Sequence, residues 1–139
     1  MTHSARLALP PPFPLHRNMR YVLAAGDAAI ILLFALLGRG AHHENGSPAY
    51  VLTTALPFLA GWYVAASVGG IYERTLLPWR WVIRDAAATA LAGGLLGLLV
   101  RSVLERRPAP VSFALVALSF LTVLLTAWHA AARAVIRSD

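Results

Sequence analysis

The polar residues that could do chemistry in this chain gather in its last apolar segment, residues 111–136. They recur at intervals of 7, 3, 4, 3 and 4 residues, which is the a and d spacing of a heptad once Leu115 fills the first gap. In a helix this spacing places them on one stripe, which inside a bilayer should face a bundle interior or another protein. The stripe consists of Ser112, Ser119, Thr122, Thr126, His129 and Arg133.

Asp27 is the second candidate, because it lies six residues into the first apolar segment, which starts at Tyr21. A carboxylate at the centre of a membrane helix costs about 2.5–3.5 kcal/mol on insertion scales, so other polar groups should compensate it. In an antiparallel bundle His129 lies at a similar depth on the same side. We therefore predict one intramembrane cluster, made of Asp27, Arg84, Asp85, His129 and Arg133.

The cluster and the stripe each have two interpretations. Asp27 and His129 either form a static latch that fixes the helix register, or exchange protons and bind a polar ligand. The hydroxyls of the stripe either form interhelical hydrogen bonds, worth about 0.6 kcal/mol each, or line a conduction path.

Cofactor and catalytic signals are weak. His42 and His43 are adjacent in a loop without a spaced third ligand, so we expect no metal site. Ligation of a pigment or haem by His129 has little support, and a bis-His haem needs a second intramembrane His. The chain has no Cys, no P-loop, no HExxH and no dinucleotide fingerprint, so we predict neither an enzyme nor a bound cofactor.

The composition indicates that a bilayer surrounds these residues. Apolar residues make up 58% of the 139 residues and charged residues 13%, about half the charged share of soluble domains. The net charge of +6 is the difference between 12 Arg and six acidic residues. The Arg are scattered at the ends of apolar runs, with no basic cluster interleaved with aromatic residues. This distribution is typical of membrane proteins and excludes a nucleic-acid partner.

Four apolar runs are long enough to cross the hydrocarbon core, and short loops make them antiparallel neighbours. We predict an all-α, integral membrane, up-down-up-down four-helix bundle with a Pro-rich tail over residues 1–20. The tail could be mobile or could lie against a neighbouring subunit as an extended arm. The predicted spans are 21–38, 51–72, 82–104 and 111–136, followed by a C-terminal tail over 137–139.

The Arg residues predict the orientation. Eight of them lie in the N-terminal tail, in the second loop with the helix start that follows it, or at the C-terminal end, and four lie on the opposite side. The positive-inside rule then places both termini in the cytoplasm, although the Arg106–Arg107 pair opposes this assignment.

Small residues form close-packing faces on the two middle spans. We expect one face inside the bundle and the other between protomers, and a kink at Pro57. Trp62 and Tyr63 should pack in the core or line a ligand cavity. The faces are Gly61, Ala65 and Gly69 on the second span, and Ala86, Ala90, Gly93 and Gly97 on the third.

The first two spans carry a family pattern. It is made of Asp27, Phe34, Gly38 and Arg39 followed by His42 or His43, and of Pro57-Phe58 with Gly61-Trp62. In these residues the chain resembles DUF3054, a family of small prokaryotic four-span membrane proteins of unknown function. The resemblance implies a multi-pass membrane protein and no established activity. It also groups Asp27, Arg39 and the loop His in one pattern, whereas the third and fourth spans match by hydropathy alone.

Two functions from different classes remain open. The first is an interaction protein of the prokaryotic inner membrane, which is either an accessory subunit of a larger, energy-transducing complex or a homo-oligomer. The second is a small transporter or proton-linked pathway that uses Asp27 and the polar stripe.

Overall fold

The structure, a computed structural model, describes residues 17–41, 47–75 and 77–136. Within these residues the chain forms four helices, each long and apolar enough to cross a membrane. They are α1 (Arg17–Ala41), α2 (Pro48–Gly69), α3 (Trp79–Glu105) and α4 (Val111–Ile136). The predicted all-α bundle of four spans is confirmed.

The helix ends differ from the predicted spans where local backbone chemistry decides them. α1 begins at Arg17, so the last residues assigned to the tail are helical, while residues 1–16 lie outside the described part. α2 ends at Gly69 instead of residue 72, because Gly70 adopts a left-handed conformation with φ of 60°. Glycine carries no Cβ penalty in this conformation, and it terminates the helix.

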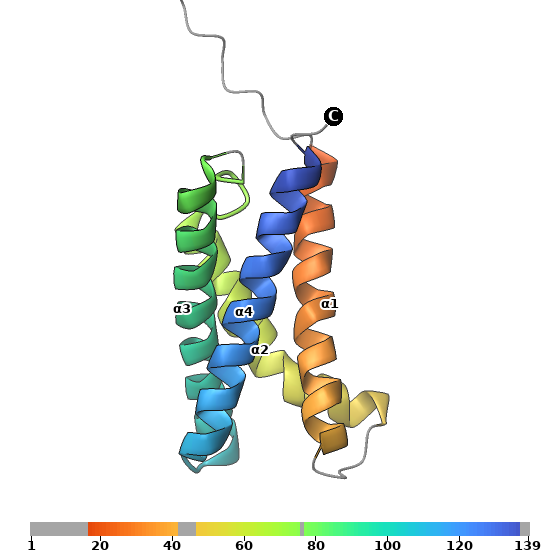
Figure 1. Cartoon of the computed structure of the whole chain (residues 1–139). Helices are drawn as coiled ribbons and strands as arrows, with labels where there is room; N and C mark the ends of the chain where they lie inside the picture. Colours follow the sequence, from red (N-terminus) through yellow and green to blue (C-terminus); the bar gives the residue numbers. More distant parts are fainter. Residues whose placement is uncertain (1–16, 42–46, 76, 137–139) are drawn as a thin grey trace, which may run out of the picture.

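The helices alternate in direction and form a closed ring. Each packs against its neighbours in the chain, and α1 also contacts α4. In Figure 1 the start of α1, the α2–α3 connection and the end of α4 lie at one end of the bundle, and the end of α1, the start of α2 and the α3–α4 connection lie at the other.

Glycines bring α2 and α3 into backbone contact. A Cβ added to Gly61 would lie 2.3 Å from the carbonyl oxygen of Gly93, and one added to Gly97 would lie 2.9 Å from Cα of Phe58. The two small-residue faces therefore pack against each other in one chain. The expectation that one of them lies between protomers is wrong for this region. Of the other members, Ala86 and Ala90 are buried, Ala65 is half-buried, and Gly69 lies near Thr89.

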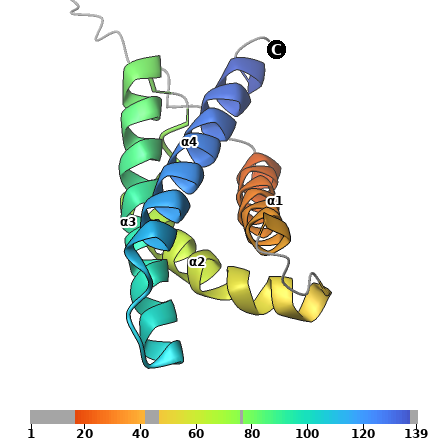
Figure 2. The ribbon, with the colours of Figure 1, turned by 60° about the horizontal axis from the view of Figure 1, so that its bottom comes forward.

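Aromatic rings fill the centre of the bundle beside Pro57. The rings of Phe34 and Phe58 meet edge to face with centroids 5.4 Å apart, a favourable arrangement for two aromatic side chains. Pro57 lies inside α2 and lacks the N–H that would donate to the carbonyl of Thr53. In Figures 1 and 2 the first turns of α2 (yellow) run at an angle to the rest of the helix, as expected for a proline kink.

Candidate functional site

Asp27 lies on the inner face of α1 and contacts α4. It belongs to a buried row with Leu23 and Ile31, spaced four residues apart on one helix face. Its Oδ1 lies 3.0 Å from Nε2 of His129, and both residues have a relative exposure of 0%. The structure thus brings together the two residues that the sequence placed at equal depth.

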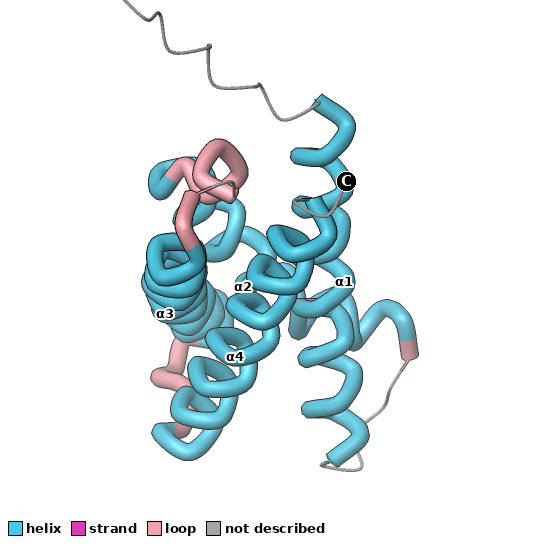
Figure 3. Tube along the Cα trace, turned by 45° about the horizontal axis from the view of Figure 1, so that its top comes forward, coloured by secondary structure: helices cyan, strands magenta, loops and turns pink. Residues whose placement is uncertain are grey.

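The second carboxylate oxygen receives two further hydrogen bonds. The indole N–H of Trp62 donates to Oδ2 of Asp27 at 3.0 Å, and the hydroxyl of Tyr72 donates to the same oxygen at 2.7 Å. Trp62 comes from α2, and Tyr72 comes from the α2–α3 connection drawn as a loop in Figure 3. The carboxylate therefore connects α1, α2, α4 and the α2–α3 connection. We call Asp27, Trp62, Tyr72 and His129 the Asp27 cluster.

The turn at Gly70 places Tyr72 in the cluster. The backbone N–H groups of Gly70 and Ile71 both donate to the carbonyl of Ala66, which closes the end of α2. Burial raises the pKa of the Tyr72 hydroxyl, and the nearby Asp27 carboxylate raises it further. The phenol therefore remains protonated and keeps donating to Asp27.

His129 is enclosed by aromatic rings. Its ring centroid lies 5.9 Å from that of Trp62 and 6.2 Å from that of Tyr72. Its Nδ1 atom is buried and has no hydrogen-bond partner among the described residues. Since Nε2 already faces Asp27, a pigment held through Nε2 would have to break the pair.

Arg133 lies one turn beyond His129 and contacts the α2–α3 connection. Its Nε donates to the carbonyl oxygen of Leu77, and its guanidinium lies 4.9 Å from the ring centroid of Trp79. The side chain is 1% exposed. It fixes the end of α4 to the start of α3.

Arg84 and Asp85 lie outside the buried cluster, contrary to the prediction. Arg84 is 62% exposed in its side chain and pairs with Asp85 at 3.1 Å, and Arg74 also pairs with Asp85 at 3.3 Å. The reason is helical phase. The buried face of α3 passes through Val82 and Ala86, and residue 84 lies on the opposite side of the helix.

The polar stripe of α4 enters the bundle only at its C-terminal end. Ser112 and Ser119 are exposed, Thr122 and Thr126 are half-buried, and His129 is buried. The buried row instead follows four-residue steps, and its members are Ala117, Leu121, Leu125, His129 and Arg133. Around an α-helix of 3.6 residues per turn, each four-residue step turns by about 40° in one sense and each heptad by about 20° in the other. The heptad stripe and the buried row therefore coincide at His129 and Arg133 and diverge toward residue 112.

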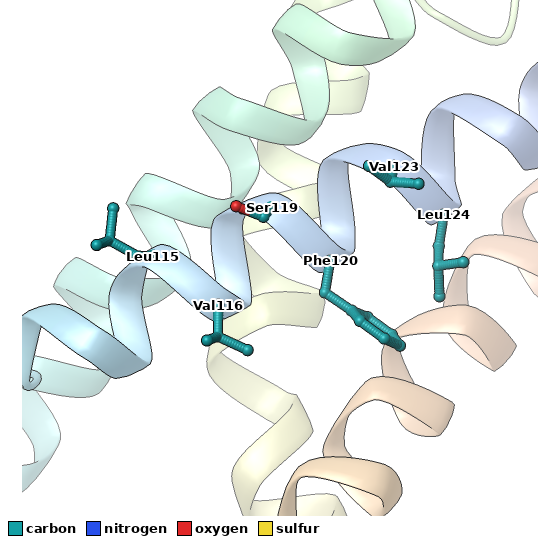
Figure 4. Close-up of a pocket in the computed structure, with 6 residues that line it drawn as sticks. All are labelled: Leu115, Val116, Ser119, Phe120, Val123 and Leu124. Atoms are coloured by element: carbon teal, nitrogen blue, oxygen red, sulfur yellow. The ribbon is translucent and has the colours of Figure 1, made fainter.

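The exposed part of α4 borders an open apolar hollow of about 490 Å³. Figure 4 shows its lining side chains projecting from α4, with the hydroxyl of Ser119 among them. The remaining members of the lining are Leu115, Val116, Phe120, Val123 and Leu124.

Two contacts near the cluster were not predicted. A Cβ on Gly26 would lie 2.2 Å from the ring of Trp128, so glycine is needed where α4 crosses α1. The hydroxyl of Tyr63 donates to the carbonyl of Ala24 at 2.6 Å. The sequence could have indicated that Trp128 and Tyr63 need partners, because an indole N–H or a phenol O–H inside a membrane segment requires a hydrogen-bond acceptor.

Arg39, another residue of the family pattern, lies at the other end of the bundle. The guanidinium of Arg39 donates to Oγ1 of Thr54 at 3.1 Å. His42 and His43 lie outside the described residues. In the part of the chain that the structure describes, no three His, Asp or Glu residues gather to hold a metal ion.

Comparison with known proteins identifies one family. The family model described as "Protein of unknown function (DUF3054)" matches residues 24–132, which contain the whole Asp27 cluster. No curated protein and no solved structure matches the chain.

Proposed function

We propose that this chain, which belongs to the DUF3054 family, is a membrane interaction protein that docks as a rigid unit in an assembly. The observation that carries this proposal is that both oxygens of the Asp27 carboxylate are hydrogen-bonded inside the bundle. A buried carboxylate whose partners come from several helices stabilises one arrangement of those helices. Such a role needs no chemical step.

The hollow beside α4 supports a protein neighbour. Ser119 exposes its hydroxyl within an otherwise apolar lining. An acyl chain offers this hydroxyl no hydrogen bond, whereas a second helix can supply one, and hydroxyls commonly join helices in membranes. The proposed assembly is either a homo-oligomer or a larger membrane complex in which this chain is an accessory subunit.

Site-specific cross-linking tests this role. A photo-reactive amino acid replaces Val123, which is 66% exposed and lines the hollow, and Leu99, which is 60% exposed on α3, serves as the control position. We expect a discrete protein adduct in native membranes from position 123 and none from position 99. An adduct of twice the chain mass indicates self-assembly, and another discrete mass indicates a larger complex. Lipid adducts alone at both positions would overturn the proposal.

The proposed orientation places both termini, and the end of the bundle with the Asp27 cluster, on the cytoplasmic side of a prokaryotic inner membrane. The support is the excess of Arg at that end, eight residues against four.

A proton-linked pathway is the second candidate, and one observation favours it. The hydroxyl oxygens of Thr122 and Thr126 and Nδ1 of His129 are buried without hydrogen-bond partners among the described residues. Their spacing along α4 leads toward Asp27, and each could bind a water molecule. The test is pH-driven proton flux in proteoliposomes. Flux that exceeds empty liposomes and is lost in a folded Asp27→Asn variant would favour this candidate, because Asn does not titrate. Flux equal to that of empty liposomes would reject it.

A further inference from the structure

The end of the bundle opposite the Asp27 cluster contains a polar pocket. It lies where α1 ends, α2 begins and α3 ends, and its volume is about 310 Å³. Its lining includes Arg39 from α1, three residues of α2, and Arg101 and Glu105 from α3. The α2 residues are Thr53, Thr54 and Pro57.

The kink at Pro57 accounts for the space. In Figures 1 and 2 the first turns of α2 lead away from α3, whereas the two helices are in backbone contact beyond this point at Gly61. Pro57 lines the pocket at the position where α2 changes direction.

Both arginines are held in fixed positions beside the pocket. Arg39 donates to Oγ1 of Thr54 at 3.1 Å and lies 5.3 Å from the ring centroid of Tyr50. Arg101 pairs with Glu105 at 2.8 Å and lies 4.5 Å from the ring centroid of Phe113. Their guanidinium groups are therefore pre-organised, which lowers the entropic cost of binding a ligand.

Arg101 retains an unused donor. Its Nε is buried and has no hydrogen-bond partner among the described residues, although the side chain as a whole is 22% exposed. A buried guanidinium N–H without an acceptor is costly. An oxyanion in the pocket would remove that cost once the side chain turns Nε toward it, and the other guanidinium N–H groups are the donors that a bound anion meets first.

The charge of the lining also favours an anion. The lining contains two arginines and one carboxylate, that of Glu105. This carboxylate pairs with Arg101 and also with Arg107, at 3.4 Å. The lining therefore carries a net charge of +1, which one singly charged anion would neutralise.

We propose that this pocket binds a phosphate group of the phosphodiester type. A tetrahedral phosphate presents several oxygens, so it can accept from Arg39 and Arg101 on different helices at once. Both arginines lie near the ends of their membrane spans, at the level where phospholipid headgroups carry this group. The phosphate comes from a lipid headgroup or from a soluble phosphate, and both offer the same chemistry.

Native mass spectrometry of the full chain in non-ionic detergent tests the proposal. The probes are phosphatidylglycerol, diacylglycerol with the same acyl chains, and inorganic phosphate as a competitor. We expect phosphatidylglycerol to bind at least about tenfold more tightly than diacylglycerol, and Arg101→Gln or Arg39→Gln to remove most of this difference. Competition by inorganic phosphate would identify a site open to soluble phosphate, and its absence a lipid site.

Two variants control for folding and general charge. Arg84 also lies over an aromatic ring, 4.0 Å from the ring centroid of Trp81, but at the other end of the bundle. Arg84→Gln should therefore not change binding. Glu105→Gln should raise the affinity several-fold, because it removes the internal anion that competes for Arg101. Equal binding of the two lipids, or unchanged affinity in Glu105→Gln, would overturn the proposal even if the arginine variants fail to fold.

Discussion

Nε2 of His129 lies 3.0 Å from Oδ1 of Asp27, which fastens the last helix to the first across 102 residues of chain. Since α1 and α4 are the terminal helices of the bundle, this pair closes the ring. Trp62 and Tyr72 complete the carboxylate's hydrogen bonds from α2 and from the connection that follows it.

Asp27→Asn should keep most of the stability, and Asp27→Leu should lose several kcal/mol. The Asn amide can turn its oxygen to Trp62 and Tyr72 and donate its NH₂ to a neutral His129. Leu instead leaves the buried Trp62 and His129 and the half-buried Tyr72 without their shared partner. The measurement is the free energy of unfolding in mixed micelles with increasing SDS. Equal losses for the two variants would contradict the latch.

Tyr72→Phe should destabilise the bundle by about 1.5–3 kcal/mol, the range for a hydrogen bond to a charged group. Tyr21→Phe is the matched control, because Tyr21 is 67% exposed and should change the stability by less than about 0.5 kcal/mol. The same unfolding experiment compares them. Similar values for both would mean that the Tyr72 hydroxyl contributes no net stability.

Gly61→Ala should cost about 1–3 kcal/mol through overpacking, because the new methyl would meet backbone atoms of Gly93 and Gly97. Gly97→Ile should weaken folding further, since the larger side chain meets Phe58. Gly38→Ala is the control. A Cβ there has no neighbour within 4 Å, and alanine should be neutral or stabilising by about 0.5–1 kcal/mol. Thermal stability in detergent ranks the variants, and a Gly61→Ala protein as stable as Gly38→Ala would refute the close contact.

Reporter fusions test the proposed orientation. A reporter in the connection between α1 and α2 should lie on the opposite side of the membrane from one at the C-terminus, with the C-terminal one in the cytoplasm. Both reporters on one side would contradict four spans, and the reverse assignment would reject the Arg-based orientation.

Much of the fold follows from the sequence because single helices are decided locally. Apolar length set the number of spans, and the Val111–Ile136 helix has the predicted bounds. Asp27 and His129 could be paired because residues at equal distances from the same membrane surface lie side by side in antiparallel helices. Arg84 was misplaced because depth does not specify which side of a helix a residue occupies.

The rest of the Asp27 cluster depends on tertiary geometry. Tyr72 reaches Asp27 only because Gly70 takes a left-handed conformation and ends α2 early. From the sequence alone, an aromatic residue at a span end indicates an interface position. The prediction that Ser112 and Ser119 face the bundle interior was wrong for a related reason. The buried face of α4 follows four-residue steps, and a heptad pattern diverges from that face.

A double-mutant cycle between Asp27→Leu and His129→Phe tests the central claim most directly. Phenylalanine keeps a ring between Trp62 and Tyr72, so the cycle isolates the polar pair. We predict a coupling energy of about 1–3 kcal/mol, because each single variant strands the other partner and the double variant does not. Losses that add within about 0.5 kcal/mol would contradict a latch between α1 and α4.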